Sequence, residues 1–284
     1  MFPHHQSTID RIVDHFSSQP GIDGVLLGGS IAHGFASETS DVDIMIVVSD
    51  EEHRRRMSTG DFHYYNTDLC TYDGGYVDGK FIGPSFLDDV EHKGSEPARF
   101  AFADAQVLFS RSTGLDEQVR RIAQYPVEGK ADRIARFYAQ LEGWHWYAGE
   151  AAKRGDDYLL GLAVSRVLLF GGRMILAHNE TLFPYHKWFT KVLESVPNKP
   201  ETLMDAFRLL SRERTVDNIA AFCDLVLGHR QWETDGTPWP ARFMTDSELT
   251  WRDGATAVSE KHRAPTSVDG SGGRLQHFGA GRKR

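Results

Sequence analysis

The stretch from Gly24 to Met45 constrains the fold of this chain more than any other part of the sequence. Residues 25–27 are a short apolar run, which is typical of a buried strand. Gly28 and Gly29 interrupt this run, and Ser30 is a residue type that often caps a helix. The stretch therefore predicts a strand that turns sharply into a helix.

A second strand is predicted to begin at Asp41, and two of its first residues are acidic. Because side chains alternate along a strand, Asp41 and Asp43 project from one face, about 7 Å apart. Such carboxylates suit hard cations such as Mg²⁺, which prefers oxygen ligands. The helix N-terminus before them offers free backbone N–H groups, and glycines allow a phosphate to come close. A phosphate cradle beside a metal-binding pair indicates phosphoryl or nucleotidyl transfer.

Together these residues resemble a known signature. It reads Gly28-Gly29-Ser30-x-Ala32-x-Gly34, followed by Ser40-Asp41-x-Asp43. This string resembles the DNA polymerase β-type nucleotidyltransferase superfamily, and most of all its antibiotic branch, whose acceptors are aminoglycoside-like and lincosamide-like. The resemblance implies a nucleotidyltransferase with two Mg²⁺ ions and with ATP as the expected co-substrate. Gly28, Gly29 and Ser30 would then bind the nucleotide. Asp41 and Asp43 would be catalytic metal ligands.

Such a site needs a third carboxylate, which the resemblance places on a neighbouring strand. Residues 63–82 are predicted to form a hairpin, because Asp73-Gly74-Gly75 is a strong turn signal between two strand-like runs. We expect Asp78, which apolar residues flank, to be the third metal ligand or the general base. Asp68 is the alternative, and the choice depends on strand register. The hairpin register places Asp68 opposite Lys80, which would make it a cross-strand partner.

The composition is that of a globular protein with room for two domains. The chain has 284 residues, of which 40% are hydrophobic and 25% charged, and its net charge is −8. An acidic chain argues against nucleic acid as a partner, because nucleic-acid binding needs a basic surface. Two cysteines without metal-finger spacing, and no signal peptide at the N-terminus, predict a cytoplasmic protein.

The chain is expected to divide into an α+β domain and an all-α domain. Residues 1–122 are predicted to form the nucleotidyltransferase domain, a small mixed β-sheet with helices on one face. Residues 127–235 lack strand signals and are predicted to form a helical bundle. Within it, residues 156–179 are apolar almost all round, which predicts the central helix of a bundle rather than a membrane span. Residues 252–284 contain almost no apolar side chains, which predicts a disordered tail.

The helical domain offers further candidate site residues. Lys187 lies in Asn179-x₄-Pro184-x₂-Lys187-Trp188, which resembles a segment of these nucleotidyltransferases, and it could bind the nucleotide as a point charge. The alternative is an ordinary surface lysine. Glu142 and Trp144 belong to an aromatic cluster that could bind a cationic acceptor substrate, or could be bundle core instead.

Arg173 lies within the apolar central helix, and a buried arginine needs a partner. We expect an ion pair with Glu142 or Glu150 of the preceding helix, or else contact with phosphate. Arg173-x₄-His178 also fits the short pattern of HEPN-type ribonucleases, which are helical bundles. The acidic composition and the complete nucleotidyltransferase signature argue against that function.

The sequence therefore predicts a Mg²⁺-dependent enzyme that moves AMP from ATP to a hydroxyl group of a small molecule. Its expected partners are a nucleoside triphosphate and that acceptor, with no membrane. The resemblance also allows a homodimer, because a second subunit completes the cleft in some relatives. Two alternatives stay open: a protein-modifying nucleotidyltransferase of a toxin–antitoxin system, and a nucleotide-binding module without catalysis.

Overall fold

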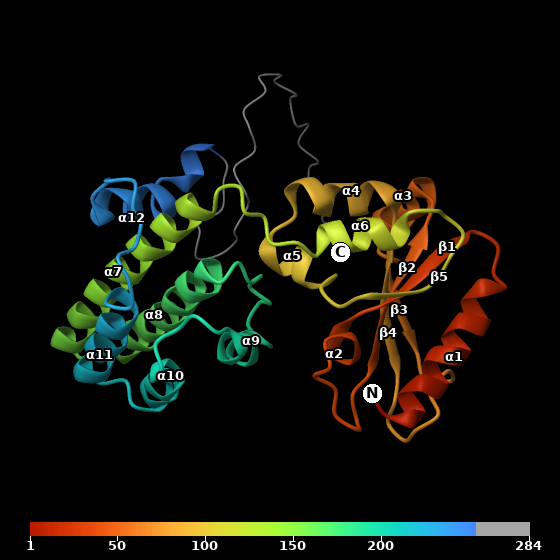
Figure 1. The fold of residues 1–284 in the computed structure, drawn as a ribbon, viewed down its shortest axis with the longest axis horizontal. Helices are drawn as coiled ribbons and strands as arrows, with labels where there is room; N and C mark the ends of the chain where they lie inside the picture. The colour runs from red at the N-terminus through yellow and green to blue at the C-terminus, as the bar shows by residue number, and fades with distance from the viewer. Residues whose placement is uncertain (254–284) are drawn as a thin grey trace, which may run out of the picture.

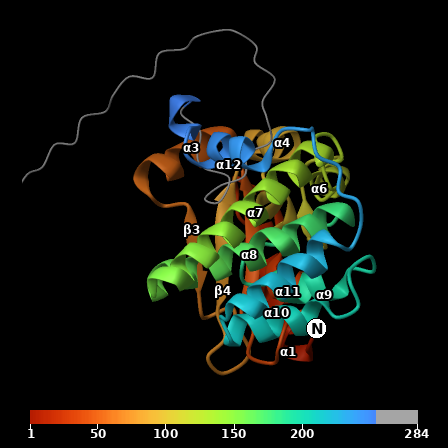
Figure 2. The ribbon, with the colours of Figure 1, turned by 90° about the vertical axis from the view of Figure 1, so that its left-hand side faces the viewer.

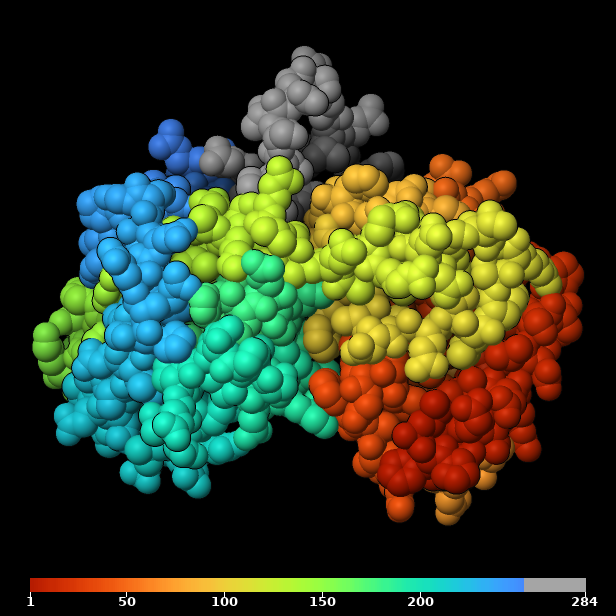
Figure 3. All heavy atoms as spheres, viewed as in Figure 1, coloured from red at the N-terminus to blue at the C-terminus, as the bar shows by residue number. Residues whose placement is uncertain are grey.

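The computed structural model describes residues 1–253. The predicted disordered tail, 252–284, lies outside these residues except for its first two, which belong to a short 3₁₀ helix, η1 (Thr250–Asp253). Figure 1 shows two parts, one built around a sheet and the other around long helices. The space-filling view in Figure 3 shows them in contact across the middle of the molecule, with a notch below that contact.

The first part is a five-stranded mixed sheet with helices, which confirms the predicted α+β fold. The sheet order is β3-β4-β2-β1-β5, and only the β2–β4 pair is parallel. Its elements in the described chain are α1 (Pro3–Ser17), β1 (Ile22–Leu27), α2 (Gly29–Ala32), β2 (Val42–Val48), α3 (Asp50–Thr59), β3 (His63–Asn66), β4 (Val77–Ile82), α4 (Pro84–Lys93), α5 (Glu96–Phe100), β5 (Gln106–Ser110) and α6 (Leu115–Ile122).

Helices cover both faces of this sheet, so the prediction of helices on one face is wrong. Ile12 and Phe16 of α1 pack with Val25 and other residues on one face. Leu87 of α4 and Val119 of α6 belong to a second core on the other face. Strands β1 and β2 are buried on both sides beyond their second residues, because both faces of the sheet are covered there. Figure 1 shows α1 and α6 on either side of the strands.

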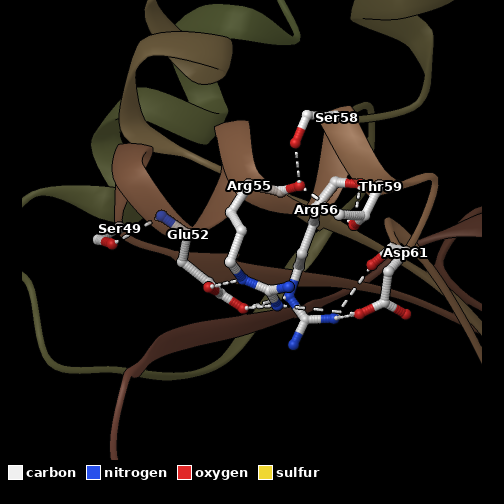
Figure 4. A network of polar contacts seen from close by, with 7 residues as sticks. All are labelled: Ser49, Glu52, Arg55, Arg56, Ser58, Thr59 and Asp61. Atoms are coloured by element: carbon white, nitrogen blue, oxygen red, sulfur yellow. Dashed lines mark hydrogen bonds and ion pairs between the residues drawn. The ribbon is translucent and has the colours of Figure 1, made fainter.

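Helix α3 is the exception to this packing, since none of its residues is buried. A polar network stabilises it instead (Figure 4). The Ser49 hydroxyl caps the helix by accepting the Glu52 N–H. Arg56 pairs with Glu52 and Asp61, and its guanidinium lies 3.6 Å from the centroid of the Phe81 ring. That stacking contact attaches the helix to β4.

The predicted hairpin is wrong in both length and register. Strand β3 ends at Asn66, whose side-chain oxygen accepts the Leu69 N–H and starts a loop. His63 lies opposite Lys80, where Asp68 was expected. Tyr72 explains why the loop stays out of the ladder: its hydroxyl donates to the Ser40 carbonyl, 2.5 Å away, which ties the loop to another segment.

The second part is helical. Its elements in the described chain are α7 (Lys130–Arg154), α8 (Asp157–His178), α9 (Phe189–Ser195), α10 (Leu203–Arg212), α11 (Val216–Leu227) and α12 (Trp239–Ser247). Helix α8 is long and apolar enough to cross a membrane, but 67% of its most apolar window is buried inside the structure, as in the core helix of a bundle. Figure 2 shows α7, α8 and α11 running across the sheet behind them.

Helix α12 follows the range predicted for the helical domain, 127–235, and packs against α7. Phe243 is buried, and a Cβ atom at Gly143 would lie 2.2 Å from its ring. Glycine at that position therefore lets the two helices approach closely. Only two residues of α12, Phe243 and Asp246, are buried. The helix therefore needs no repeating pattern of apolar residues that the sequence analysis could have detected.

Candidate active site

Three carboxylates meet at the beginning of two neighbouring strands. Each of Asp41, Asp43 and Asp78 offers an oxygen, and these atoms all lie within 4.8 Å of one another. Strands β2 and β4 are parallel with Asp43 directly beside Asp78, and alternation along β2 brings Asp41 to the same face. Within residues 1–253 no other group of acids, histidines and cysteines is arranged in this way. The structure thus brings together the three predicted acids, while their role as ligands stays a prediction.

The carboxyl group of Asp43 has a raised pKa. Its pKa rises from 3.8 to about 6, chiefly because the carboxyl is buried and then because Asp41 and Asp78 repel its charge. The positive charge of Lys187 and a hydrogen bond from the Ser30 backbone N–H oppose this rise in pKa. A site with three acids at close range is electrostatically suited to a cation.

The glycine turn is built around Asp43. Gly29 has a φ of +60°, and a Cβ atom there would lie 1.7 Å from a carboxylate oxygen of Asp43. Only glycine fits this position without moving that acid. The Gly28 N–H donates to the Asp43 carbonyl at 2.9 Å, which joins the end of β1 to β2.

Ser30 does not cap α2, so that expectation is wrong. Helix α2 is a single turn that begins at Gly29, and Gly28 occupies the cap position. The Ser30 backbone N–H is directed to the Asp43 carboxylate instead. Its hydroxyl is buried and has no hydrogen-bond partner within the described chain. Ser30 therefore orients a carboxylate, and its hydroxyl is an unsatisfied polar atom at the edge of the site.

Two of the carboxylates and both glycines of the turn line one pocket of about 360 Å³. Its walls are Gly28, Gly29, Asp43, Ile44, Met45, His63, Asp78, Gly79, Lys80 and Ala101. A second cavity, of about 400 Å³, lies between the beginning of α7 and the loop after α11, and none of the three carboxylates lines it. The pocket with the carboxylates is the candidate active site, because it joins the acids to the glycine turn.

Two residues of this pocket do not follow from the sequence reasoning. His63 Nε2 lies 2.6 Å from an Asp78 carboxylate oxygen. Lys80 lies two residues after Asp78 on the same face of β4, and within the described residues its ammonium forms no ion pair. Alternation along β4 could have found Lys80. His63 depends on the β3 register, which the turn signal misplaced.

Lys187 approaches the carboxylates from the helical part. It lies on the loop between α8 and α9, and its charge acts on Asp43. Its ammonium is 5.2 Å from the centroid of the Trp188 ring, and that ring lies 5.1 Å from the ring of Phe35 after α2. The two parts of the molecule therefore meet beside the glycine turn, and the positive charge of Lys187 acts on Asp43.

The other predicted candidates lie outside the pocket. Asp68 is exposed on the loop after β3 and is not a member of the acidic group. Trp144 donates to Gln140 and packs on Phe243 of α12. Glu142 lies beside Tyr138 on α7. Neither Glu142 nor Trp144 lines the pocket, so their predicted substrate role has no contact to support it.

Arg173 pairs with Glu96 of α5, and not with Glu142 or Glu150 as expected. Glu150 pairs with Lys153 and Arg154 on its own helix. His178 has a different partner, since its Nδ1 lies 2.7 Å from an Arg230 nitrogen. Arg173 and His178 therefore have separate structural contacts, which does not favour a shared ribonuclease site.

The segment that holds this site matches a known protein family. A family model described as a nucleotidyltransferase domain matches residues 9–92, which include the glycine turn and all three carboxylates. No curated protein matches the chain. Among solved structures, a nucleotidyltransferase-like protein from Exiguobacterium sibiricum 255-15 is similar, with 10% identity and a TM-score of 0.46 over 88% of this chain and 79% of that one. Residues 9–92 are therefore a nucleotidyltransferase domain of the DNA polymerase β-type superfamily, and the chain is a nucleotidyltransferase.

Proposed function

We propose that the chain moves a nucleoside monophosphate, AMP from ATP, to a hydroxyl group of a small molecule, with Mg²⁺ as cofactor. One observation carries this proposal: Asp41, Asp43 and Asp78 converge beside the glycine turn, and that turn shares a pocket with two of them. Nucleotidyl transfer follows from the family, whereas the nucleotide, the metal and the acceptor are inferred from the site.

The donor set fits Mg²⁺. Three carboxylates supply only hard oxygen ligands. The pKa of Asp43 is raised by burial and then by repulsion from Asp41 and Asp78, and a bound cation would offset that repulsion. The buried Ser30 hydroxyl without a partner marks a second unsatisfied group at the same place. Bound Mg²⁺ would activate the attacking hydroxyl and neutralise the leaving pyrophosphate.

Each residue of the site then has its own role in the reaction. The absence of a Cβ at Gly29 lets the Asp43 carboxylate lie against the glycine turn, whose backbone N–H groups would bind the phosphates. The acceptor oxygen bonds to the α-phosphorus, the bond to the β-phosphate oxygen breaks, and pyrophosphate leaves. Asp78 is suited to accept the acceptor proton, because its side chain is 42% exposed and His63 orients it. Lys187, whose positive charge acts on Asp43, would attract the negative charge of the triphosphate.

The charge of the protein favours a small acceptor over nucleic acid. The chain carries a net charge of −8, and the pocket walls include two carboxylates for one lysine. Such a surface repels a phosphate backbone and attracts a cationic molecule. An amine-bearing compound with a free hydroxyl therefore fits the site best.

Incubating the purified protein with labelled triphosphates, Mg²⁺ and a panel of hydroxyl acceptors tests this function. Asp43→Asn should reduce transfer by at least about a hundredfold, since it removes a charged metal ligand from the reacting site. Asp68→Asn is the matched control, because it makes the same chemical change on an exposed loop, and it should leave transfer unchanged. Full transfer by Asp43→Asn would refute the mechanism.

Two other outcomes would favour the alternatives. Label that appears only on a second protein would indicate a protein-modifying enzyme. Triphosphate binding without release of pyrophosphate, across the whole acceptor panel and in cell extract, would indicate a nucleotide-binding module.

A further inference from the structure

Glu96 and Arg173 are two charged residues buried where the parts of the molecule meet. Glu96 begins α5, in the sheet part, and its side chain is 3% exposed. Arg173 lies in α8, the central helix of the other part, and its side chain is 5% exposed. An Arg173 nitrogen lies 3.1 Å from a Glu96 oxygen. An ion pair shielded from water therefore joins the two parts, and removing one partner would leave the other uncompensated.

The same glutamate holds the loop between α8 and α9. Its second oxygen accepts the Phe183 N–H at 3.0 Å. The Arg173 guanidinium lies 4.7 Å from the centroid of the Phe183 ring and 4.1 Å from that of Phe137. Residues 179–188 form turns and extended segments without a helix or a strand, so side-chain contacts fix their path. Glu96 thus controls the backbone at Phe183 and, through Arg173, its side chain.

This loop carries Lys187, four residues after Phe183, to the side of the glycine turn. The Lys187 ammonium lies 5.2 Å from the centroid of the Trp188 ring, and that ring lies 5.1 Å from the ring of Phe35, which follows α2. Helix α5 also contacts the site directly, because Ala101 at its end lines the pocket with Asp43 and Asp78. Phe100, which lies between Glu96 and Ala101 in the sequence, packs against the core of the helical part. One short helix therefore connects the anchor of the loop with the wall of the pocket.

We propose that Glu96 is a positioning residue for the nucleotide: by holding Phe183 and Arg173, it places Lys187 where the triphosphate lies. This inference rests on the proposed function, since it requires that Lys187 contacts phosphate. If Glu96 had only a structural role, its substitution would change the stability of the protein and leave the affinity for nucleotide unchanged.

The affinity for ATP with Mg²⁺, measured by calorimetry without acceptor, provides the test. Glu96→Leu with Arg173→Met removes the ion pair and the Phe183 hydrogen bond without leaving a buried charge. We expect ATP to bind about tenfold more weakly, the effect of losing a charge-assisted contact. In a Lys187→Met background the same pair of changes should alter the affinity for ATP by less than about twofold, because the contact between Lys187 and the triphosphate, which Glu96 would position, is already absent.

A second variant covers the case in which the double variant does not fold. Glu96→Gln keeps the volume and one acceptor but loses the charge, and we expect about threefold weaker binding, again abolished by Lys187→Met. Ile219→Val, a core change on α11, is the control for general destabilisation and should leave the affinity unchanged. An unchanged affinity in both Glu96 variants, or an equal loss with and without Lys187, would overturn the proposal.

Amide hydrogen exchange separates this inference from the proposed function. Peptides that cover residues 179–188 should exchange faster in the Glu96→Leu/Arg173→Met protein than in Ile219→Val, even without nucleotide. If the unaltered protein binds no triphosphate, the proposed function fails, and the exchange result still decides whether Glu96 fixes the loop. Unchanged exchange would refute the anchoring itself.

Discussion

Asp43 is the residue at which the constraints of the site meet. Its carbonyl accepts the Gly28 N–H, its carboxylate accepts the Ser30 N–H, and the backbone of Gly29 lies against its side chain. Its carboxylate is near that of Asp78 on the neighbouring strand β4. The glycine turn and the metal-binding acids are therefore one unit, because a change in the turn moves an acid.

Gly29→Ala should damage the site far more than the same change at Gly34. Both glycines have positive φ. A Cβ atom at Gly29 would lie 1.7 Å from the Asp43 carboxylate, whereas a Cβ atom at Gly34 would meet no atom within 4 Å. Backbone strain of about 1 kcal/mol is common to both variants. We expect Gly29→Ala alone to lower ATP affinity, by at least about tenfold, in calorimetry with Mg²⁺. Equal losses in both variants would mean that backbone strain, and not displacement of Asp43, is responsible.

Asp43→Asn should stabilise the metal-free protein at neutral pH. The pKa of Asp43 is raised to about 6 from 3.8 by burial and by repulsion from Asp41 and Asp78. A raised carboxyl pKa means that the folded state binds the proton more tightly, so the cost of the charged form is present above pH 6 and disappears as pH falls towards 4. We expect a gain of about 1–2 kcal/mol at pH 8, reduced from the full shift because the site is partly solvated.

Urea unfolding with a chelator present, at pH 8 and pH 4.5, measures this gain. The difference between Asp43→Asn and the unaltered protein should shrink at the lower pH. Asp68→Asn serves as the control, because it lies outside the acidic group and should give no gain at either pH. A gain of equal size at both values would show that charge repulsion is not its source.

At the scale of the elements, the alternation of the strands was the most informative pattern. It places Asp41 and Asp43 on one face from the sequence alone, and the acid within the next strand, Asp78, lies beside them. Long helices such as α7 and α8 were also predictable, since their apolar residues recur over many turns. Both kinds of pattern are local, so a single chain is enough to detect them.

Elements set by distant contacts were not predictable. The turn signal at Asp73-Gly74-Gly75 is real, because Gly74 adopts a φ of +69°, but it lies inside a longer loop. The length of that loop depends on Tyr72, which contacts Ser40 more than thirty residues away. Helix α5 has only five residues, and its glutamate is buried by a partner from the other part. No local pattern reports such contacts, so strand register and the interdomain anchor had to come from the structure.

At the scale of the whole molecule, the site depends on how the two parts are joined. Phe35, Phe100 and Tyr125 of the first 126 residues pack against the core of the helical part. Two further arginines, Arg99 and Arg133, are buried near the linker and donate to backbone carbonyls. These buried contacts join the two parts beside the glycine turn, where Trp188 of the helical part packs on Phe35.

Helix α12 should be an integral part of the helical bundle, although the predicted domain ends at residue 235. Phe243 fills the space above Gly143 on α7, and Arg242 pairs with Asp132 of α7 and with Asp246 of its own helix. Deleting residues 236–284 should therefore cost at least about 3 kcal/mol of unfolding free energy, the usual cost of removing a buried aromatic side chain. Deleting only residues 254–284 is the matched control, because it leaves all of these contacts in place. If the two shortened chains unfold at the same urea concentration, α12 adds nothing to the bundle, and the core of the helical part ends with α11.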